Sequence, residues 1–188
     1  MLEAQRHARM PTTTRKMKTI AILVCAAILA TGCAGRRAAA LYAPLPFDAE
    51  EYAALPKTGT GTVKGQVFAK TVGGDVKKGA GNVVALLPAT SFRKHWYSES
   101  YLPSRPASVA PDVRHEAYDK EKTTDGEGRF EFTDVPPGQY FVLSSVKWET
   151  VSSNQYSRRL GLTDSQGGYV VRQIEVKNGA TTDAILSR

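Results

Sequence analysis

Cysteine is scarce in this chain and absent from most of it. The two cysteines among the 188 residues are Cys25 and Cys33. The segment after Cys33 therefore contains no thiol and cannot be held by disulfide bonds, which many exported proteins use. Its stability must come from a packed interior, and a segment of this length is sufficient for one domain.

Long apolar runs and clusters of basic residues are also missing. The apolar run over residues 20–30 has eleven residues, whereas a transmembrane helix needs about 20. No run of Lys or Arg exceeds two residues, and residues 1–32 alone hold five Lys or Arg and one Glu of a chain whose net charge is +7. A nucleic-acid partner requires a clustered basic face, so the sequence argues against one.

A basic start, a short apolar run and small residues before a cysteine follow one another in residues 15–33. The apolar run has the length of the hydrophobic region of a secretory signal. The ending Leu29-Ala30-Thr31-Gly32-Cys33 resembles the processing site of bacterial lipoproteins. The resemblance implies that residues 1–32 are a signal peptide and that Cys33 becomes the acylated N-terminus, carrying palmitate. An ordinary signal peptide cleaved nearby, or a buried core segment, remains the alternative.

The region around this cysteine predicts where the chain is held. Translation could begin at Met1, Met10 or Met17, and the mature protein would be the same. The residue after Cys33 is Ala and not Asp, which in the resembled lipoproteins permits transport outward. We therefore expect a lipid anchor in the cell envelope, at the periplasmic face of the outer membrane. We interpret residues 33–60 as a flexible tether, although its apolar residues could instead dock on the domain.

From residue 61 onward the side chains alternate with a period of two. In Thr62-Val63-Lys64-Gly65-Gln66-Val67 the polar residues alternate with Val63, Gly65 and Val67, as in a strand with one exposed face. Apolar runs or alternation predict further strands around residues 83–87, 130–132, 140–148, 170–176 and 182–186. No segment after residue 60 shows a convincing helical period. The pattern therefore predicts an all-β domain.

Two turn-rich motifs make the fold prediction more specific. The first is Thr124-Asp125-x-x-Gly128-x-Phe130-x-Phe132, which predicts a tight hairpin, and the second is Val135-Pro136-x-Gly138-x-Tyr140. Together with Gly65-x-Val67 and the strand at 83–87, they resemble the carboxypeptidase regulatory-like domain. The resemblance implies a transthyretin-like (prealbumin-like) Greek-key β-sandwich of about seven strands over residues 61–188. Domains of this family are accessory modules, and the peptidase domain of the parent enzymes has no counterpart here.

The main departure from the family pattern is an insertion at about residues 89–121. It contains five residues that could form a partner-binding surface for a glycan or a protein: Arg93, His95, Trp96, Tyr97 and Tyr101. Aromatic and Arg side chains supply much of the energy of such surfaces. The alternative is that aromatic residues of the insertion fold back over the sandwich.

No constellation of residues predicts catalysis. After Cys33 the histidines are His95 and His115, and the His-x-His cluster of iron-binding dioxygenases on related folds is missing. We therefore predict no metal, no cofactor and no catalytic residue. The sequence favours a membrane-anchored, non-enzymatic module that recognises an envelope protein or a polysaccharide. The alternative is a small hydrolase or metal-dependent oxygenase with a site built on residues 89–121.

Overall fold

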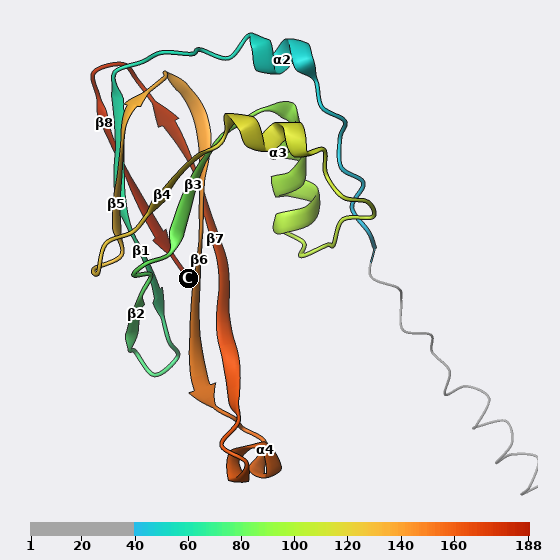
Figure 1. The fold of residues 1–188 in the computed structure, drawn as a ribbon, viewed down its shortest axis with the longest axis vertical. Helices are drawn as coiled ribbons and strands as arrows, with labels where there is room; N and C mark the ends of the chain where they lie inside the picture. The colour runs from blue at the N-terminus through green and yellow to red at the C-terminus, as the bar shows by residue number, and fades with distance from the viewer. Residues whose placement is uncertain (1–39) are drawn as a thin grey trace, which may run out of the picture. The chain divides into compact units, whose positions relative to one another are not determined.

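The computed structural model describes residues 40–188, which form one compact unit. The predicted signal peptide and Cys33 lie outside the described residues. Eight strands form two sheets of four (Figure 1). The first sheet contains β1 (Gly61–Lys70), β2 (Val76–Lys78), β5 (Arg129–Val135) and β8 (Thr181–Ser187). The second contains β3 (Val83–Pro88), β4 (Lys120–Thr123), β6 (Gly138–Val151) and β7 (Thr163–Val176).

Strand pairing is antiparallel throughout the second sheet, in the order β4-β3-β6-β7. In the first sheet β1 pairs antiparallel with β2 and β5 and parallel with β8, where Val67 aligns with Leu186. The hairpin of β6 and β7 continues past the sandwich and ends in the short helix α4 (Gln155–Arg159) (Figure 1). The predicted all-β sandwich is confirmed, with eight strands where about seven were expected.

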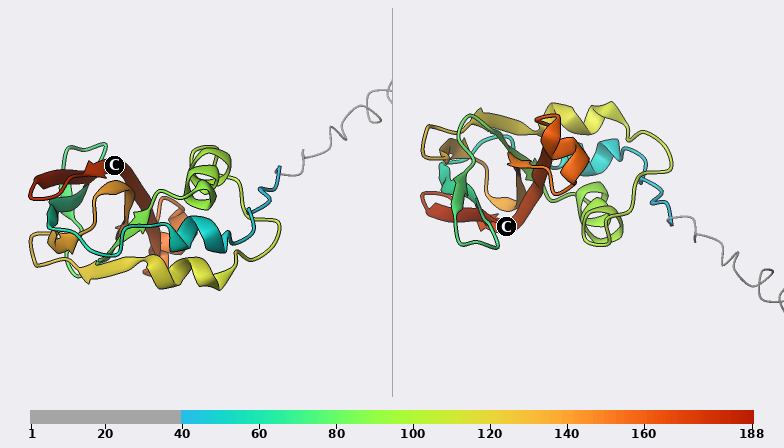
Figure 2. Two further views of the ribbon diagram at one scale, coloured as in Figure 1. Left: turned by 90° about the horizontal axis from the view of Figure 1, so that it is seen from above. Right: turned by 90° about the horizontal axis from the view of Figure 1, so that it is seen from below.

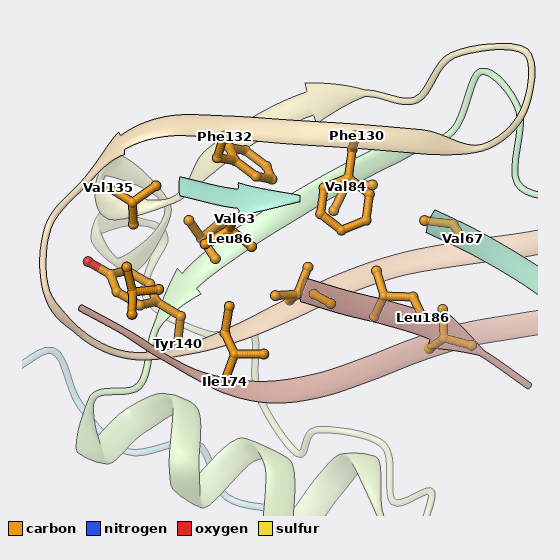
Figure 3. Close-up of a cluster of buried hydrophobic side chains, with 14 of the residues drawn as sticks. Val63, Val67, Val84, Leu86, Phe130, Phe132, Val135, Tyr140, Ile174 and Leu186 are labelled. Carbon is orange, nitrogen blue, oxygen red and sulfur yellow. The ribbon is translucent and has the colours of Figure 1, made fainter. Parts of the chain in front are cut away.

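The core lies between the two sheets because each strand directs every second side chain inward. Figure 3 shows Val63 and Phe132 of the first sheet close to Leu86 of the second. The buried cluster includes residues from the predicted strand positions: Val67, Phe130, Tyr140, Val142, Val146, Val170, Ile174, Val176, Ala184 and Leu186. Burial of this apolar surface is the main stabilising contribution that the fold makes.

Strand β3 is apolar on both faces, which explains why residues 83–87 form an unbroken apolar run. Val84 and Leu86 enter the core between the sheets. Leu87 points to the outer face of the second sheet and joins a second buried cluster with Phe141, against which Tyr97 packs. The outer face is therefore covered by the insertion instead of by water.

The insertion is helical, which the period-two reading of the sequence missed. Thr90 caps the helix α3 (Ser91–Trp96), a π-helical turn η1 follows (Tyr97–Tyr101), and a 3-10 helix η2 spans Val113–Tyr118. Helix α3 has six residues, and neither the π-helical turn that continues it nor the separate 3-10 helix η2 follows the α-helical period. Figure 2 shows these helices and α2 (Ala49–Ala53) gathered on one side of the sandwich. In residues 40–188 no helix is both long and apolar enough to span a membrane.

The predicted hairpin at residues 124–132 is a turn between sheets. Asp125 accepts hydrogen bonds through its side chain from the backbone N–H groups of Glu127 and Arg129, and Gly128 adopts a φ of 76°, which favours glycine. However, β4 pairs with β3 and β5 pairs with β1. The turn is correctly located, but it carries the chain from one sheet to the other.

The described part of the predicted tether is docked on the domain. Tyr42 pairs as an isolated bridge with Ala107 of the insertion, and its side chain is 3% exposed. Tyr52 of helix α2 is 2% exposed. Pro44 and Pro46 keep the chain between the two tyrosines out of regular helix. Over residues 40–60 the expectation of a free tether is therefore wrong, and the alternative of docking holds.

Candidate functional site

A groove of about 480 Å³ opens where four connections meet at one end of the sandwich. These are the segment through α2, the turn from β3 into α3, the passage from η2 into β4 and the turn from β5 into β6. Its lining includes Lys57, Lys94, Tyr118, Lys120, Pro136 and Pro137. We call this site the α2 groove. A concave, largely apolar surface with a few polar groups at its edge is typical of small-molecule and saccharide sites.

The base of the α2 groove is fixed by a chain of buried hydrogen bonds. The hydroxyl group of Tyr52 lies 2.9 Å from Oγ1 of Thr90 and 2.8 Å from Nδ1 of His115. The imidazole of His115 is 1% exposed and stacks on Phe92 with ring centroids 3.5 Å apart. Burial raises the pKa of Tyr52 and lowers the pKa of His115. The cluster is thus neutral and links α2 to both ends of the insertion.

Besides Tyr52, two tyrosines line the groove, and they differ in what they offer a ligand. Tyr140 is buried and donates a hydrogen bond to the carbonyl group of Pro136 over 3.0 Å, so its hydroxyl is already engaged. Tyr118 is 40% exposed and rests its ring against Tyr52 with centroids 4.6 Å apart. A supported, exposed aromatic ring in a groove that the partly exposed Pro137 also lines can stack on the apolar face of a sugar.

Three lysines give the rim of the groove a positive charge. Lys57, Lys94 and Lys120 are all exposed. The carboxylate of Glu51 also lines the groove, and its Oε1 accepts hydrogen bonds from the backbone N–H and the hydroxyl group of Ser91. The rim therefore presents free ammonium groups as hydrogen-bond donors.

Behind the groove an ion pair ties α3 to the end of η2. A guanidinium nitrogen of Arg93 lies 2.5 Å from a carboxylate oxygen of Asp119, and both side chains are mostly buried. Burial raises the pKa of Asp119 to about 6, against the opposing effect of Arg93. The carboxyl group of Asp119 therefore titrates close to neutral pH and not in the acidic range of an exposed aspartate.

The structure places the five residues predicted as a partner-binding surface in different environments. Arg93 points inward to Asp119, and Nε2 of His95 lies 3.2 Å from the carbonyl oxygen of Ala43. Tyr97 packs on Phe141 at 5.0 Å between ring centroids. These three contacts agree with the packing alternative for those residues.

Trp96 and Tyr101 are the remaining members of the predicted surface. Both are partly exposed, and their ring centroids lie 5.6 Å apart. The hydroxyl group of Tyr101 donates to the carbonyl oxygen of Tyr169 on β7 over 3.3 Å. Their role as a binding surface stays a prediction.

Sequence reasoning missed the α2 groove because its walls come from four separate segments of the chain. Lys57 and Pro136 are far apart in the chain, and only the fold brings them to one site. The motif at residues 135–138 was predicted as a turn, but nothing in its sequence indicated that its prolines line a groove. The one useful sign was Tyr118, an aromatic residue in an insertion that departs from the family pattern.

The two histidines available as metal ligands are used for packing and for contact with the backbone, as described above. Within residues 40–188 no three His, Cys, Asp or Glu side chains are grouped to hold a metal ion. The groups that the α2 groove presents are ring faces and ammonium groups.

Comparison with solved structures gives an informative match. No family model matches the sequence, and no curated protein matches it. A solved structure from Pseudomonas aeruginosa, described as a "putative carbohydrate binding protein", is 31% identical in sequence with a TM-score of 0.64. The match covers 77% of this chain and 99% of that one. The chain belongs to the same family as this Pseudomonas aeruginosa protein.

Proposed function

We propose that the protein is a lipid-anchored, non-enzymatic module of the cell envelope that binds carbohydrate in the α2 groove. The observation that carries the proposal is the exposed ring of Tyr118, which Tyr52 supports from behind, in a groove that Pro137 and three lysines also line. The relationship to the Pseudomonas aeruginosa protein, described as carbohydrate binding, supports the same class of ligand.

The arrangement suits a sugar for a physical reason. A pyranose ring has an apolar face that packs on an aromatic or proline ring and hydroxyl groups that need hydrogen-bond partners at its edge. The α2 groove supplies the ring faces at its base and the donors of Lys57, Lys94 and Lys120 at its rim. Because Tyr52, Thr90 and His115 fix the base, the groove is formed before a ligand arrives, which lowers the entropic cost of binding.

Replacement of one residue tests this site. Purified full chain in nonionic detergent is titrated calorimetrically with a panel of neutral and acidic oligosaccharides. Tyr118→Ala should weaken binding of any ligand found by roughly two- to tenfold, the loss of about 0.5–1.5 kcal/mol of ring stacking. Tyr156→Ala is the matched control, because Tyr156 is 73% exposed on α4, at the other end of the domain in Figure 1.

The anchoring part of the proposal has a separate test. Cys33→Ser removes the thiol that would be acylated and should shift the protein from the membrane fraction to the soluble fraction. A variant that stays in the membrane fraction would contradict lipid attachment at Cys33 without bearing on the α2 groove.

A further inference from the structure

The rim of the α2 groove carries an unbalanced positive charge, from which we infer that the groove selects saccharides bearing carboxylate groups, such as uronic acid polymers. This inference rests on the proposed function and specifies its ligand. Three ammonium groups, those of Lys57, Lys94 and Lys120, share one concave surface. Their mutual repulsion is unfavourable in the free protein and is relieved when a negative ligand binds.

None of the three lysines is neutralised within the described domain. The ion pairs of residues 40–188 join other side chains, such as Lys78 with Glu127 and Arg93 with Asp119. Lys120 donates one hydrogen bond to the backbone carbonyl of Asp134 over 3.2 Å, which engages one of its three protons and none of its charge. The charge at the rim is therefore available to a ligand.

The carboxylate that residues 40–188 contribute to the groove does not balance this charge. Glu51 directs Oε1 to the backbone N–H of Ser91 at 2.8 Å and to its hydroxyl group at 3.1 Å. It therefore serves to hold α2 against the start of α3. With one carboxylate engaged in this way and three free ammonium groups, the groove keeps a net positive charge.

Lysine, as opposed to arginine, fits a ligand whose acidic groups vary in position. An ammonium group is a flexible point charge, whereas a guanidinium group imposes a planar, bidentate geometry. Three flexible cations around a Tyr and Pro base suit a chain of sugar rings that carries one carboxylate per residue. Attraction of this kind weakens with salt because the rim is exposed.

The test compares two oligosaccharides that differ in charge alone. Oligogalacturonate and its fully methyl-esterified form have the same rings and linkages, so they separate charge from ring stacking. With the full chain in nonionic detergent at about 0.1 M salt, the acidic oligomer should bind at least tenfold more tightly than the ester. The difference should shrink to less than threefold at high salt.

Lysine variants locate the charge. Lys57→Gln, Lys94→Gln and Lys120→Gln should each weaken binding of oligogalacturonate about two- to fivefold, and the triple variant should bind both oligomers equally. Lys147→Gln is the matched control, because Lys147 is an exposed lysine of β6 outside the groove, and it should leave binding unchanged. An equal loss in the control would overturn the inference, since it would show attraction to the net charge of the protein.

The remaining outcomes distinguish the inference from the proposed function. Equal binding of the acid and the ester would contradict the charge selection while leaving carbohydrate binding intact. Failure of every oligosaccharide in the panel to bind would contradict the proposed function itself. Detergent-free Cys33→Ser protein that bound phosphatidylglycerol vesicles as tightly as oligogalacturonate, with the same dependence on the three lysines, would overturn the requirement for a saccharide.

Discussion

The hydroxyl group of Tyr52 lies 2.8 Å from Nδ1 of His115, although the two residues are 63 positions apart in the chain. This contact joins the segment before the sandwich to the insertion between β3 and β4. The ring of Tyr52 also supports Tyr118, the exposed aromatic residue of the α2 groove. One buried hydrogen-bonded pair therefore determines both how the N-terminal segment docks and how the groove is shaped.

Tyr52→Phe tests this relationship directly. The variant keeps the ring but removes the hydroxyl group, leaving Thr90 and His115 without their shared partner. A buried polar group without a partner costs about 1–3 kcal/mol, so we expect the free energy of unfolding in urea to fall by about that amount. Tyr156→Phe is the control, because Tyr156 is exposed, and it should change stability by less than about 0.5 kcal/mol. Equal stability of the two variants would show that the Tyr52 contact contributes little.

The Arg93–Asp119 pair predicts an unusual dependence of stability on pH. Burial raises the pKa of Asp119 from 3.8 to about 6 in the folded protein. The folded state then binds the proton more tightly than the unfolded state does. Protonation of Asp119 therefore adds fully to the free energy of unfolding below about pH 4, and this stabilisation is lost as the pH rises through 6. Between pH 4 and pH 7 the free energy of unfolding of the wild-type protein should fall by roughly 2 kcal/mol relative to that of Asp119→Asn, with solvent screening included.

The comparison between the two proteins isolates Asp119 from its neighbour. Burial and Arg93 lower the pKa of His115. The neutral imidazole therefore adds to the free energy of unfolding above the ordinary pKa of histidine, and this stabilisation is lost as the pH falls. This effect is common to the wild type and to Asp119→Asn and cancels in the difference between their unfolding free energies. A difference that increased with pH would mean that Arg93 keeps Asp119 ionised against the effect of burial.

Gly65 provides a test of the sandwich itself. It lies in β1 between β5 and β8, where a Cβ atom would overlap the carbonyl group of Ala184 and lie 2.8 Å from Cζ of Phe130. Gly65→Ala should therefore lower the free energy of unfolding by about 2 kcal/mol or more through overpacking. Gly126→Ala is the matched control, because nothing lies within 4 Å of its added methyl group, and thermal unfolding should show little change. A tolerated Gly65→Ala would contradict the close pairing of β1 with β8.

The strands were predictable because their side chains alternate between the core and the outer face of the sheet. Val63 and Val67 of β1, and Ala184 and Leu186 of β8, alternate with exposed residues, and all four are buried. Turn residues such as Asp125 and Gly128 were recognisable from their local backbone needs. Which strands the turn would join depends on pairing at long range, and the sequence did not determine it.

The insertion and the groove were not predictable for a related reason. Helix α3 spans Ser91–Trp96, so it is too short to reveal a period, and its position depends on the contact of Tyr97 with Phe141 across the sheet. The docking of Tyr52 depends on His115, which the sequence places in an unrelated segment. The sequence predicted a binding surface from other aromatic residues of the insertion, and Tyr118, which borders the α2 groove, was not among them.

The most direct test of carbohydrate binding in the α2 groove is a map of the surface that a saccharide contacts. We would record amide spectra of the isotopically labelled full chain carrying Cys33→Ser while oligogalacturonate is added. Binding in the groove predicts the largest shifts at Lys57, Lys94, Tyr118 and Gln139, which all line it. Shifts confined to the surface around Trp96 and Tyr101, or no shifts at any saccharide concentration, would contradict it.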